Sequence, residues 1–314
     1  MLFRQQQSAL PWQDDSMGQV EPFHPPFEPG IFDFLAARAV AGVEQATSTS
    51  YARTLSLPGG HAWFRLAWDG MRLLLNHEVE DAADSPTLAA HVRHLFNLDH
   101  DPAAADAALG MDPLLSGRVA SLPGIRLPGC VDPNEILIRA MIGQQITVAA
   151  ATTALRQLVA LSTPSRLPHG SMTRFFPTPA QIAADGRTIL RGPQRRIDSI
   201  IAVAGLLADG SLRLDASDTP ESLAEKLLPL PGIGPWTVDY VSMRVLGSSD
   251  IFLPTDSAVR NGFGLLRGDS LSTARSIKAP ELARMAEPLR PWRSYATLHF
   301  WRVSGEKSVG GVSR

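Results

Sequence analysis

A Gly-x-Gly turn between two helical segments is the first place where this sequence could hold a ligand. Residues 230–240 read LPGIGPWTVDY, with Gly232 and Gly234 in the turn and Pro235 at the start of the second helix. Glycine accepts backbone conformations that other residues avoid, and it lets a partner approach the bare backbone. The N–H groups at the start of the second helix suit an anion such as a phosphate. A helical hairpin without a ligand has the same pattern, so this segment alone leaves both interpretations open.

A carboxylate ends the loop that follows this hairpin. Residues 250–256 read DIFLPTD. The order and spacing of the two motifs resemble the helix–hairpin–helix DNA glycosylase superfamily, and the hairpin motif itself would lie at about residues 221–247. In that family the hairpin holds one DNA strand through backbone amides. The resemblance therefore implies that double-stranded DNA is contacted by Gly232, Ile233, Gly234 and Thr237.

By the same resemblance, Asp256 is the catalytic carboxylate. Cleavage of an N-glycosidic bond builds positive charge on the sugar, and a nearby carboxylate stabilises that charge or activates water. The structural alternative is that Asp256 caps the helix that begins at Ser257. The two roles are compatible.

Two residue types distinguish the branches of this superfamily. Bifunctional members carry a lysine that forms a Schiff base with the sugar, and the matching residue here is Trp236, so we expect no lyase activity. Cys130 is the only cysteine, which excludes the four-cysteine iron–sulfur cluster of another branch. Three stretches resemble the bacterial 3-methyladenine DNA glycosylase II (AlkA-like) family: residues 34–40, 127–132 and 291–296.

This resemblance implies a monofunctional enzyme of base excision repair that flips alkylated purines out of DNA and excises them. Two other functions share parts of the pattern. A non-catalytic protein that binds damaged DNA would keep the hairpin but would not need Asp256. A glycosylase for oxidised or mismatched bases is disfavoured, because the lysine and the cluster are absent.

By the same resemblance, four aromatic side chains would line the base pocket: Trp236, Tyr240, Trp292 and Phe34. A purine alkylated at a ring nitrogen is cationic, and electron-rich aromatic faces attract a cation more than a neutral base. The alternative is that these rings belong to the hydrophobic core, and for Phe34 we favour that alternative.

Gln144 and Gln145 lie where the family inserts a wedge into the gap that the flipped base leaves. The family's best-studied type has an apolar side chain at the position of Gln145, so glutamine is a departure that could act through hydrogen bonds to the unpaired base. Alternatively, both lie on an exposed helical face. Ser257 is a second departure, because an aromatic residue is usual there. Arg38 matches a position near the pocket, although an exposed ion-paired arginine fits the sequence equally.

The strands and helices that the sequence predicts around these residues indicate an α+β protein. Alternating apolar residues predict strands at 51–57, 61–68 and 71–75, with a hairpin turn at Asp69-Gly70. A helix is expected at 31–39 and another after an N-cap at Ser85. Helical periodicity then predicts the remaining helices at 135–161 (interrupted at Gly143), from Thr178, at 195–207, 221–228 and 295–303.

We therefore expect an N-terminal antiparallel β-sheet domain with helices, followed by an all-α helix–hairpin–helix glycosylase core. Residues 1–22 would form a disordered tail, 23–102 the α+β domain and 103–314 the helical core. That core would comprise two subdomains, one at about 132–228 and one formed by 103–131 plus 229–306.

Composition and charge restrict the partners. The net charge of −2 is unevenly distributed: residues 1–100 hold 6 Lys/Arg against 12 Asp/Glu, whereas residues 230–314 hold 11 against 7. A basic C-terminal part is compatible with DNA. The apolar runs are too short to cross a bilayer and no signal peptide is evident, so we expect a cytoplasmic monomer. The scattered histidines predict no transition-metal site, and no cofactor is expected except a possible monovalent cation at the hairpin.

Overall fold

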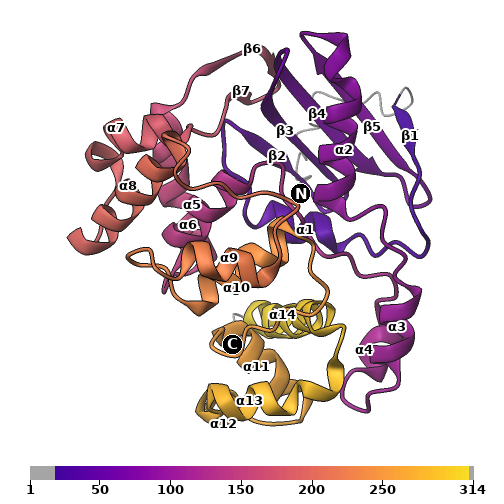
Figure 1. Ribbon diagram of the computed structural model, residues 1–314. Coiled ribbons are helices and arrows are strands. Elements are labelled where there is room, and N and C mark those ends of the chain that lie inside the picture. Colours follow the sequence, from indigo (N-terminus) through magenta and orange to yellow (C-terminus); the bar gives the residue numbers. More distant parts are fainter. Residues whose placement is uncertain (1–17, 311–314) are drawn as a thin grey trace, which may run out of the picture.

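The computed structural model describes residues 18–310, which form a β-sheet unit and two groups of helices (Figure 1). The sheet is antiparallel with the strand order β1–β5–β4–β3–β2. Trp68 pairs with Leu73 across the expected hairpin, and Gly70 has a φ of +100°, so that turn is confirmed. The strands are β1 (Gln19–Glu21), β2 (Glu44–Ala46), β3 (Ser50–Leu57), β4 (Gly60–Trp68) and β5 (Leu73–Val79).

Strand β1 corrects the expectation of a disordered tail up to residue 22. Residues 19–21 pair with β5, and only residues 1–17 of the expected tail lie outside the described part. Backbone pairing explains this strand, because the N–H and C=O groups of β5 would otherwise form an open sheet edge. One side chain of β1 is buried, that of Glu21, which forms an ion pair of 3.4 Å with Arg93. Strand β1 has only three residues, and its one buried side chain is a carboxylate. The sequence therefore shows no alternation of apolar and polar residues that would predict a strand there.

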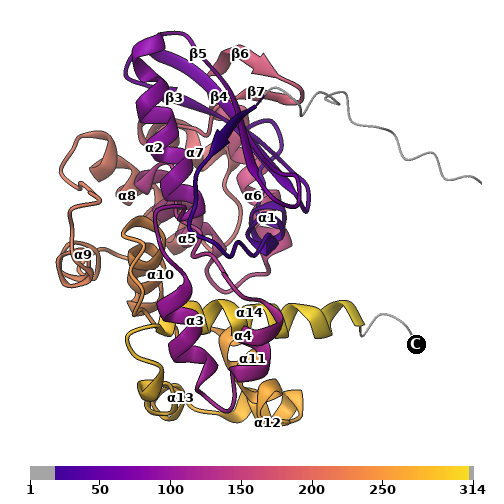
Figure 2. The same cartoon turned by 90° about the vertical axis from the view of Figure 1, so that its right-hand side faces the viewer.

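Two helices of the N-terminal unit pack against the sheet. The apolar stripe predicted for α2 (Ser85–Phe96) is confirmed, since Leu88, Val92, Leu95 and Phe96 are buried in the same cluster as the strands. The N-cap is Asp84 rather than Ser85. Helix α1 (Gly30–Ala36) ends earlier than expected and lies where the sheet unit meets the helical groups (Figure 2).

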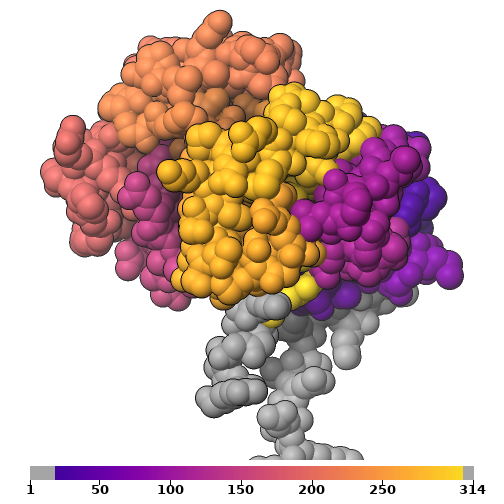
Figure 3. Space-filling model, turned by 90° about the horizontal axis from the view of Figure 1, so that it is seen from below, coloured from indigo at the N-terminus to yellow at the C-terminus, as the bar shows by residue number. Residues whose placement is uncertain are grey.

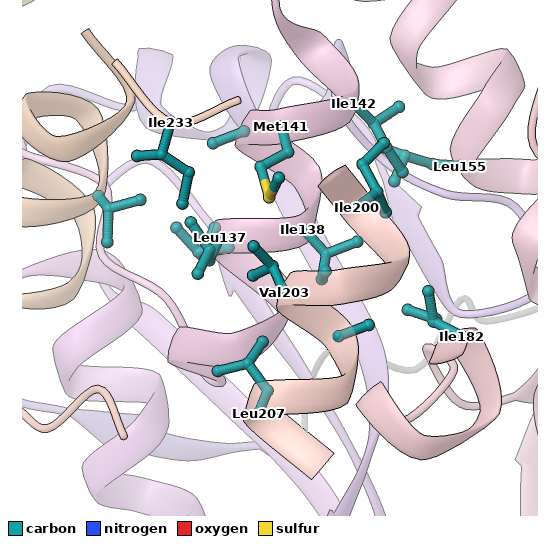
Figure 4. Close-up of a cluster of buried hydrophobic side chains, with 14 of the residues drawn as sticks. Leu137, Ile138, Met141, Ile142, Leu155, Ile182, Ile200, Val203, Leu207 and Ile233 are labelled. Carbon is teal, nitrogen blue, oxygen red and sulfur yellow. The ribbon is translucent and has the colours of Figure 1, made fainter. Parts of the chain in front are cut away.

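The helical groups are organised around two further cores. The first core includes side chains of α5, α8 and α10, and Figure 4 shows residues of α5 and α8 facing one another. Its helices are α5 (Pro133–Gly143), α6 (Val148–Leu158), α7 (Pro179–Ile189), α8 (Gln194–Ala208), α9 (Pro220–Leu227) and α10 (Pro235–Val245).

The second core joins the C-terminal helices to α3 and α4, which flank them on the lower face (Figure 3). Its helices are α3 (Ala103–Gly110), α4 (Ser116–Ser121), α11 (Ser257–Leu266), α13 (Ala279–Met285) and α14 (Arg293–Gly310), and α12 (Leu271–Ser276) packs against α11. Within residues 18–310, no helix has the length and apolar character needed to cross a membrane.

A second, two-stranded sheet interrupts the helical part, which we had expected to be all-α. Strands β6 (Pro164–His169) and β7 (Met172–Arg174) form this hairpin. It packs on the first sheet, with the His169 ring stacked 3.7 Å from Trp63 and the backbone N–H of Arg166 donating to His61 Nδ1 at 2.8 Å. No side chain of β6 is buried, and the strand holds two prolines and a single leucine, so no alternation of apolar residues predicts the hairpin. Its contacts tie the helical part to the sheet unit.

A buried arginine fixes the segment that leads into α1. Arg126 is 1 % exposed and donates to the backbone carbonyls of His24, Pro26, Asn97 and His100. These bonds join the chain before α1 to the chain after α2, so they position the helix that carries Phe34 and Arg38.

We expect Arg126→Met to lower the free energy of unfolding by about 3 kcal/mol, because buried carbonyl groups lose their donors. Thermal unfolding would measure this as a lower Tm. Arg118→Met is the matched control: its half-exposed ion pair with Glu306 should contribute less than about 1 kcal/mol. Equal Tm values for the two variants would contradict the assigned role of Arg126.

Candidate active site

The hairpin between α9 and α10 presents its backbone at the surface. Gly232 has a φ of +79°, and a Cβ there would lie 2.8 Å from Ser199 Cβ and Oγ, so both backbone conformation and space require glycine. Gly234 is the N-cap of α10. Within residues 18–310, the amides of Gly232 and Gly234 have no acceptor, whereas the amide of Ile233 donates to Leu230 O at 3.2 Å.

Two of the four residues expected to contact DNA from this hairpin point inward instead. The side chain of Ile233 is 7 % exposed and belongs to the first helical core. Thr237 is 1 % exposed, and its Oγ1 accepts a hydrogen bond of 2.8 Å from Gln144 Nε2. The side chains of Ile233 and Thr237 therefore support the turn from below, and the expected DNA contact through the backbone amides of the hairpin stays a prediction.

Gln144 and Gln145 lie in a linker between two helices, not on the exposed helical face that we considered. Helix α5 ends at Gly143 and α6 begins at Val148. Gln144 Nε2 also donates to Gly232 O at 2.9 Å, so this side chain fastens the linker to the hairpin. Gln145 is exposed and has a φ of +59°, a conformation that non-glycine residues rarely adopt. The linker thus holds Gln145 outward in a strained conformation beside the hairpin.

Asp256 combines the two roles that the sequence left open. It is the N-cap of α11, and its Oδ1 accepts from the amides of Ala258 and Val259 at 2.9 and 3.0 Å. Two indole N–H groups also donate to the carboxylate: Trp236 to Oδ2 at 3.1 Å and Trp301 to Oδ1 at 3.2 Å. Donors of this kind stabilise an ionised carboxylate. Asp256 is half-buried and lines a cavity of about 940 Å³.

Aromatic rings from three helices surround this carboxylate. Trp236 and Tyr240 on α10 stack with their centroids 5.3 Å apart and their planes 10° from parallel. Trp301 on α14 stacks on Phe34 of α1 at 5.9 Å and is tilted against Tyr240 at 6.4 Å. All four rings line the cavity, and Phe34 is half-buried there. Phe34 thus contributes to the pocket rather than to the core alone.

Trp292, which we expected in the base pocket, does not line this cavity. Trp292 lies before α14 and contacts the rings of His100 and Tyr295 at 5.9 and 5.8 Å. Trp301 occupies the wall instead, and the sequence analysis missed it. Its spacing within α14 continues the buried stripe of Tyr295 and Leu298, so helical periodicity does not distinguish it from a core residue. Only the packing of α14 against Asp256 distinguishes the two tryptophans.

Two arginines complete the cavity wall. The guanidinium carbon of Arg38 lies 3.7 Å from the centroid of Phe34, and its Nη1 donates to Phe34 O at 3.1 Å. Arg244, which the sequence analysis missed, is buried and donates to Tyr240 Oη at 2.7 Å and to the carbonyls of Pro128 and Gly129. Burial would raise the pKa of the Tyr240 hydroxyl, but Arg244 and Arg38 together lower it below its usual value.

Comparison with known proteins places these features in one family. Residues 21–132 match the family described as the AlkA N-terminal domain. The chain is 32 % identical to DNA-3-methyladenine glycosylase 2 of Escherichia coli, over 90 % of this chain and 96 % of that protein. It is 40 % identical to the probable bifunctional transcriptional activator/DNA repair enzyme AlkA of Mycobacterium tuberculosis, over 87 % of this chain. The chain spans 54 % of the length of that relative.

The fold agrees with this assignment. The structure of 3-methyladenine DNA glycosylase from Archaeoglobus fulgidus superposes with a TM-score of 0.77 at 16 % identity, covering 93 % of this chain and 99 % of that one. The fold is thus an N-terminal antiparallel sheet followed by helix–hairpin–helix glycosylase helices, with the small β6–β7 sheet as an addition to our expectation. This chain belongs to the AlkA family of helix–hairpin–helix 3-methyladenine DNA glycosylases.

Proposed function

We propose that this protein is a monofunctional DNA glycosylase that flips an alkylated purine out of double-stranded DNA and hydrolyses its N-glycosidic bond. The observation that carries the proposal is the position of Asp256, held by Trp236 and Trp301 in the wall of an aromatic cavity. A protein that only binds damaged DNA has no need of a carboxylate held in this way.

The geometry supports separate roles for the alkylated base, which leaves, and for Asp256, which faces the sugar. Alkylation at a ring nitrogen makes the purine a good leaving group, so the main requirement is to stabilise the positive charge that builds on the sugar. The Asp256 carboxylate supplies the opposite charge, and two indole and two backbone donors hold it in place. Among the described residues, Oδ2 accepts only from Trp236, which leaves a lone pair to orient water or to face the sugar.

DNA binding is assigned to the hairpin and to the linker beside it. The amides of Gly232 and Gly234 and the N-terminus of α10 suit a DNA phosphate. Gln145 is the wedge in this proposal: its outward position next to the hairpin fits a side chain that enters the gap left by the flipped base. The amide can bond to the unpaired base.

The proposal includes neither a lyase step nor a cofactor. The residues that line the cavity include no lysine, and Trp236 stands where an amine nucleophile would be needed. A monovalent cation at the hairpin carbonyls stays a prediction; one of these carbonyls, that of Gly232, also accepts a bond from Gln144. We further propose that the protein acts as a monomer.

The test is incubation of the wild-type protein with methylated duplex DNA, followed by chromatography of released bases and electrophoresis of the strands. We expect free 3-methyladenine and abasic sites, with strand breaks only after alkali. Breaks without alkali would contradict the monofunctional assignment. Tight binding to alkylated DNA without base release would make the damage-binding alternative the better one.

We expect Gln145→Ala to slow base release about tenfold while leaving Tm unchanged, because the wedge side chain is lost but no buried contact is. The rate should depend on the base opposite the lesion in the wild type and lose that dependence in the variant. Gln157→Ala, on the exposed face of α6, is the matched control. Equal rates for both variants would remove Gln145 from the proposed DNA interface.

A further inference from the structure

Two arginines bring positive charge to the cavity: Arg38, which the resemblance places near the pocket, and Arg244, which it did not predict. Arg38 and Arg244 both approach the ring of Phe34, at 3.7 and 5.2 Å from its centroid. Neither guanidinium forms an ion pair with a carboxylate in the described part of the chain, because their hydrogen bonds go to Phe34 O, Tyr240 Oη and two backbone carbonyls. Elsewhere in the cavity wall, Arg53 is paired with Glu135, whereas no ion pair is seen for Asp33, Asp132 or Arg126 within the described residues.

Among the charged groups that contact the aromatic rings of the cavity, positive charge is in excess. Two guanidiniums face one carboxylate, Asp256, which attracts Arg38 across the cavity. The lowered pKa of Tyr240 reports the same excess of positive charge next to its hydroxyl. The aromatic face that we expected to attract a cationic purine, that of Phe34, is already covered by Arg38.

This arrangement changes what the pocket should prefer. A guanidinium repels a base with a positive charge, and it offers planar N–H donors that match a carbonyl oxygen. Arg38 is half-buried, where water screens such interactions less than at the surface. Arg244 is held by Tyr240 and by two backbone carbonyls, whereas Arg38 is held by one carbonyl, by the Phe34 ring and by the Tyr240 hydroxyl. Arg38 is therefore the better placed of the two to turn toward a base.

We propose that Arg38 determines substrate specificity by favouring neutral modified bases that present a carbonyl oxygen over bases that carry a positive charge. The inference rests on the proposed function, since it concerns which base is released. Arg38 would act by contact with the base and not on the sugar, where Asp256 acts.

The test compares single-turnover release of hypoxanthine and of 7-methylguanine from otherwise identical duplexes. Both bases have a carbonyl at the same ring position, but only 7-methylguanine is cationic in DNA. Each rate is divided by the rate of spontaneous release without protein. We expect the wild-type enhancement to be larger for hypoxanthine. A wild type whose enhancement is larger for 7-methylguanine would overturn the inference without any variant.

Arg38→Met keeps the length of the side chain and removes its charge and donors. We expect it to slow hypoxanthine release about tenfold and to leave 7-methylguanine release unchanged or faster. Arg38→Lys keeps the charge without the planar donors, so it should still disfavour 7-methylguanine while losing part of the hypoxanthine rate. Arg284→Met, on the exposed face of α13, controls for the loss of one positive charge in DNA binding.

The outcomes separate the inference from the function on which it rests. If the wild type releases neither base nor 3-methyladenine, the proposed function fails. If it releases them, but Arg38→Met slows both bases equally at an unchanged Tm, Arg38 only supports Phe34 and the specificity role is wrong. A tenfold change in the ratio of the two rates, absent in Arg284→Met, would support it.

Discussion

Asp256→Asn is expected to reduce the rate of base release by about 100-fold to 1,000-fold, the usual cost of removing one electrostatic contact to a transition state. The substitution removes the negative charge that opposes the developing charge of the sugar. It also replaces Oδ2 by an amide nitrogen, which cannot accept the Trp236 indole bond. Single-turnover kinetics on a duplex with one alkylated purine measure the effect.

The same substitution should leave the fold and DNA affinity nearly unchanged. Asparagine caps helices as well as aspartate does, and its Oδ1 can still accept from the amides of Ala258 and Val259. Asp256→Ala removes the cap as well, so it should lower stability by about 1 kcal/mol in addition to abolishing release. If Asp256→Asn and wild type release base at equal rates, Asp256 is a helix cap only.

Trp301→Phe should slow base release about tenfold or more, and Trp292→Phe should not slow it by more than about twofold. Phenylalanine keeps an aromatic wall but cannot donate to Asp256, and a hydrogen bond to a charged group contributes about 1.5–3 kcal/mol. Trp292 makes ring contacts outside the cavity, so it is a control of the same residue type. The comparison needs only the two single-turnover rates and Tm values.

If Trp292→Phe slows base release more than Trp301→Phe does, Trp292 lines the base pocket and Trp301 has been wrongly assigned to its wall. A loss of Tm in Trp301→Phe would call for Trp301→Tyr, which keeps more of the ring's bulk and likewise lacks the indole donor.

The parts of the site that the sequence predicted are those fixed by local backbone chemistry. Gly232 is required by a positive φ and a close approach to Ser199, and Asp256 is fixed by the helix that begins after it. Trp236 and Tyr240 are four residues apart on one helix, so one face must carry both. The β4–β5 turn and the stripe of α2 were predictable for the same reason.

The parts that the sequence did not predict depend on contacts between distant segments. Trp301 reaches the cavity only because α14 packs beside the N-terminus of α11, and its spacing in the chain resembles that of a core residue. Arg244 is buried by carbonyls of Pro128 and Gly129 from a remote loop. Strands β1, β6 and β7 pair by backbone bonds without apolar alternation. No pattern of neighbouring residues in the sequence predicts contacts between segments that are far apart in the chain.

The sequence identified Gln144 as part of the DNA-facing segment, but it did not predict the contacts of its side chain. Its position suggested a surface role, but it bonds to Gly232 O and Thr237 Oγ1 and so couples the wedge linker to the hairpin. Through Gln144, the two segments assigned to DNA binding form one unit. The neighbouring Gln145 is the residue left to face the DNA.

The most direct test of the central claim is the structure of Asp256→Asn bound to a duplex with one alkylated purine. We expect the purine to lie in the cavity against Trp301, with the sugar C1′ about 3.5 Å from the side chain at position 256. The phosphate of a neighbouring nucleotide should lie at the amides of Gly232 and Gly234. A base that stays stacked in the duplex, or that enters the cavity with its sugar remote from position 256, would contradict the account.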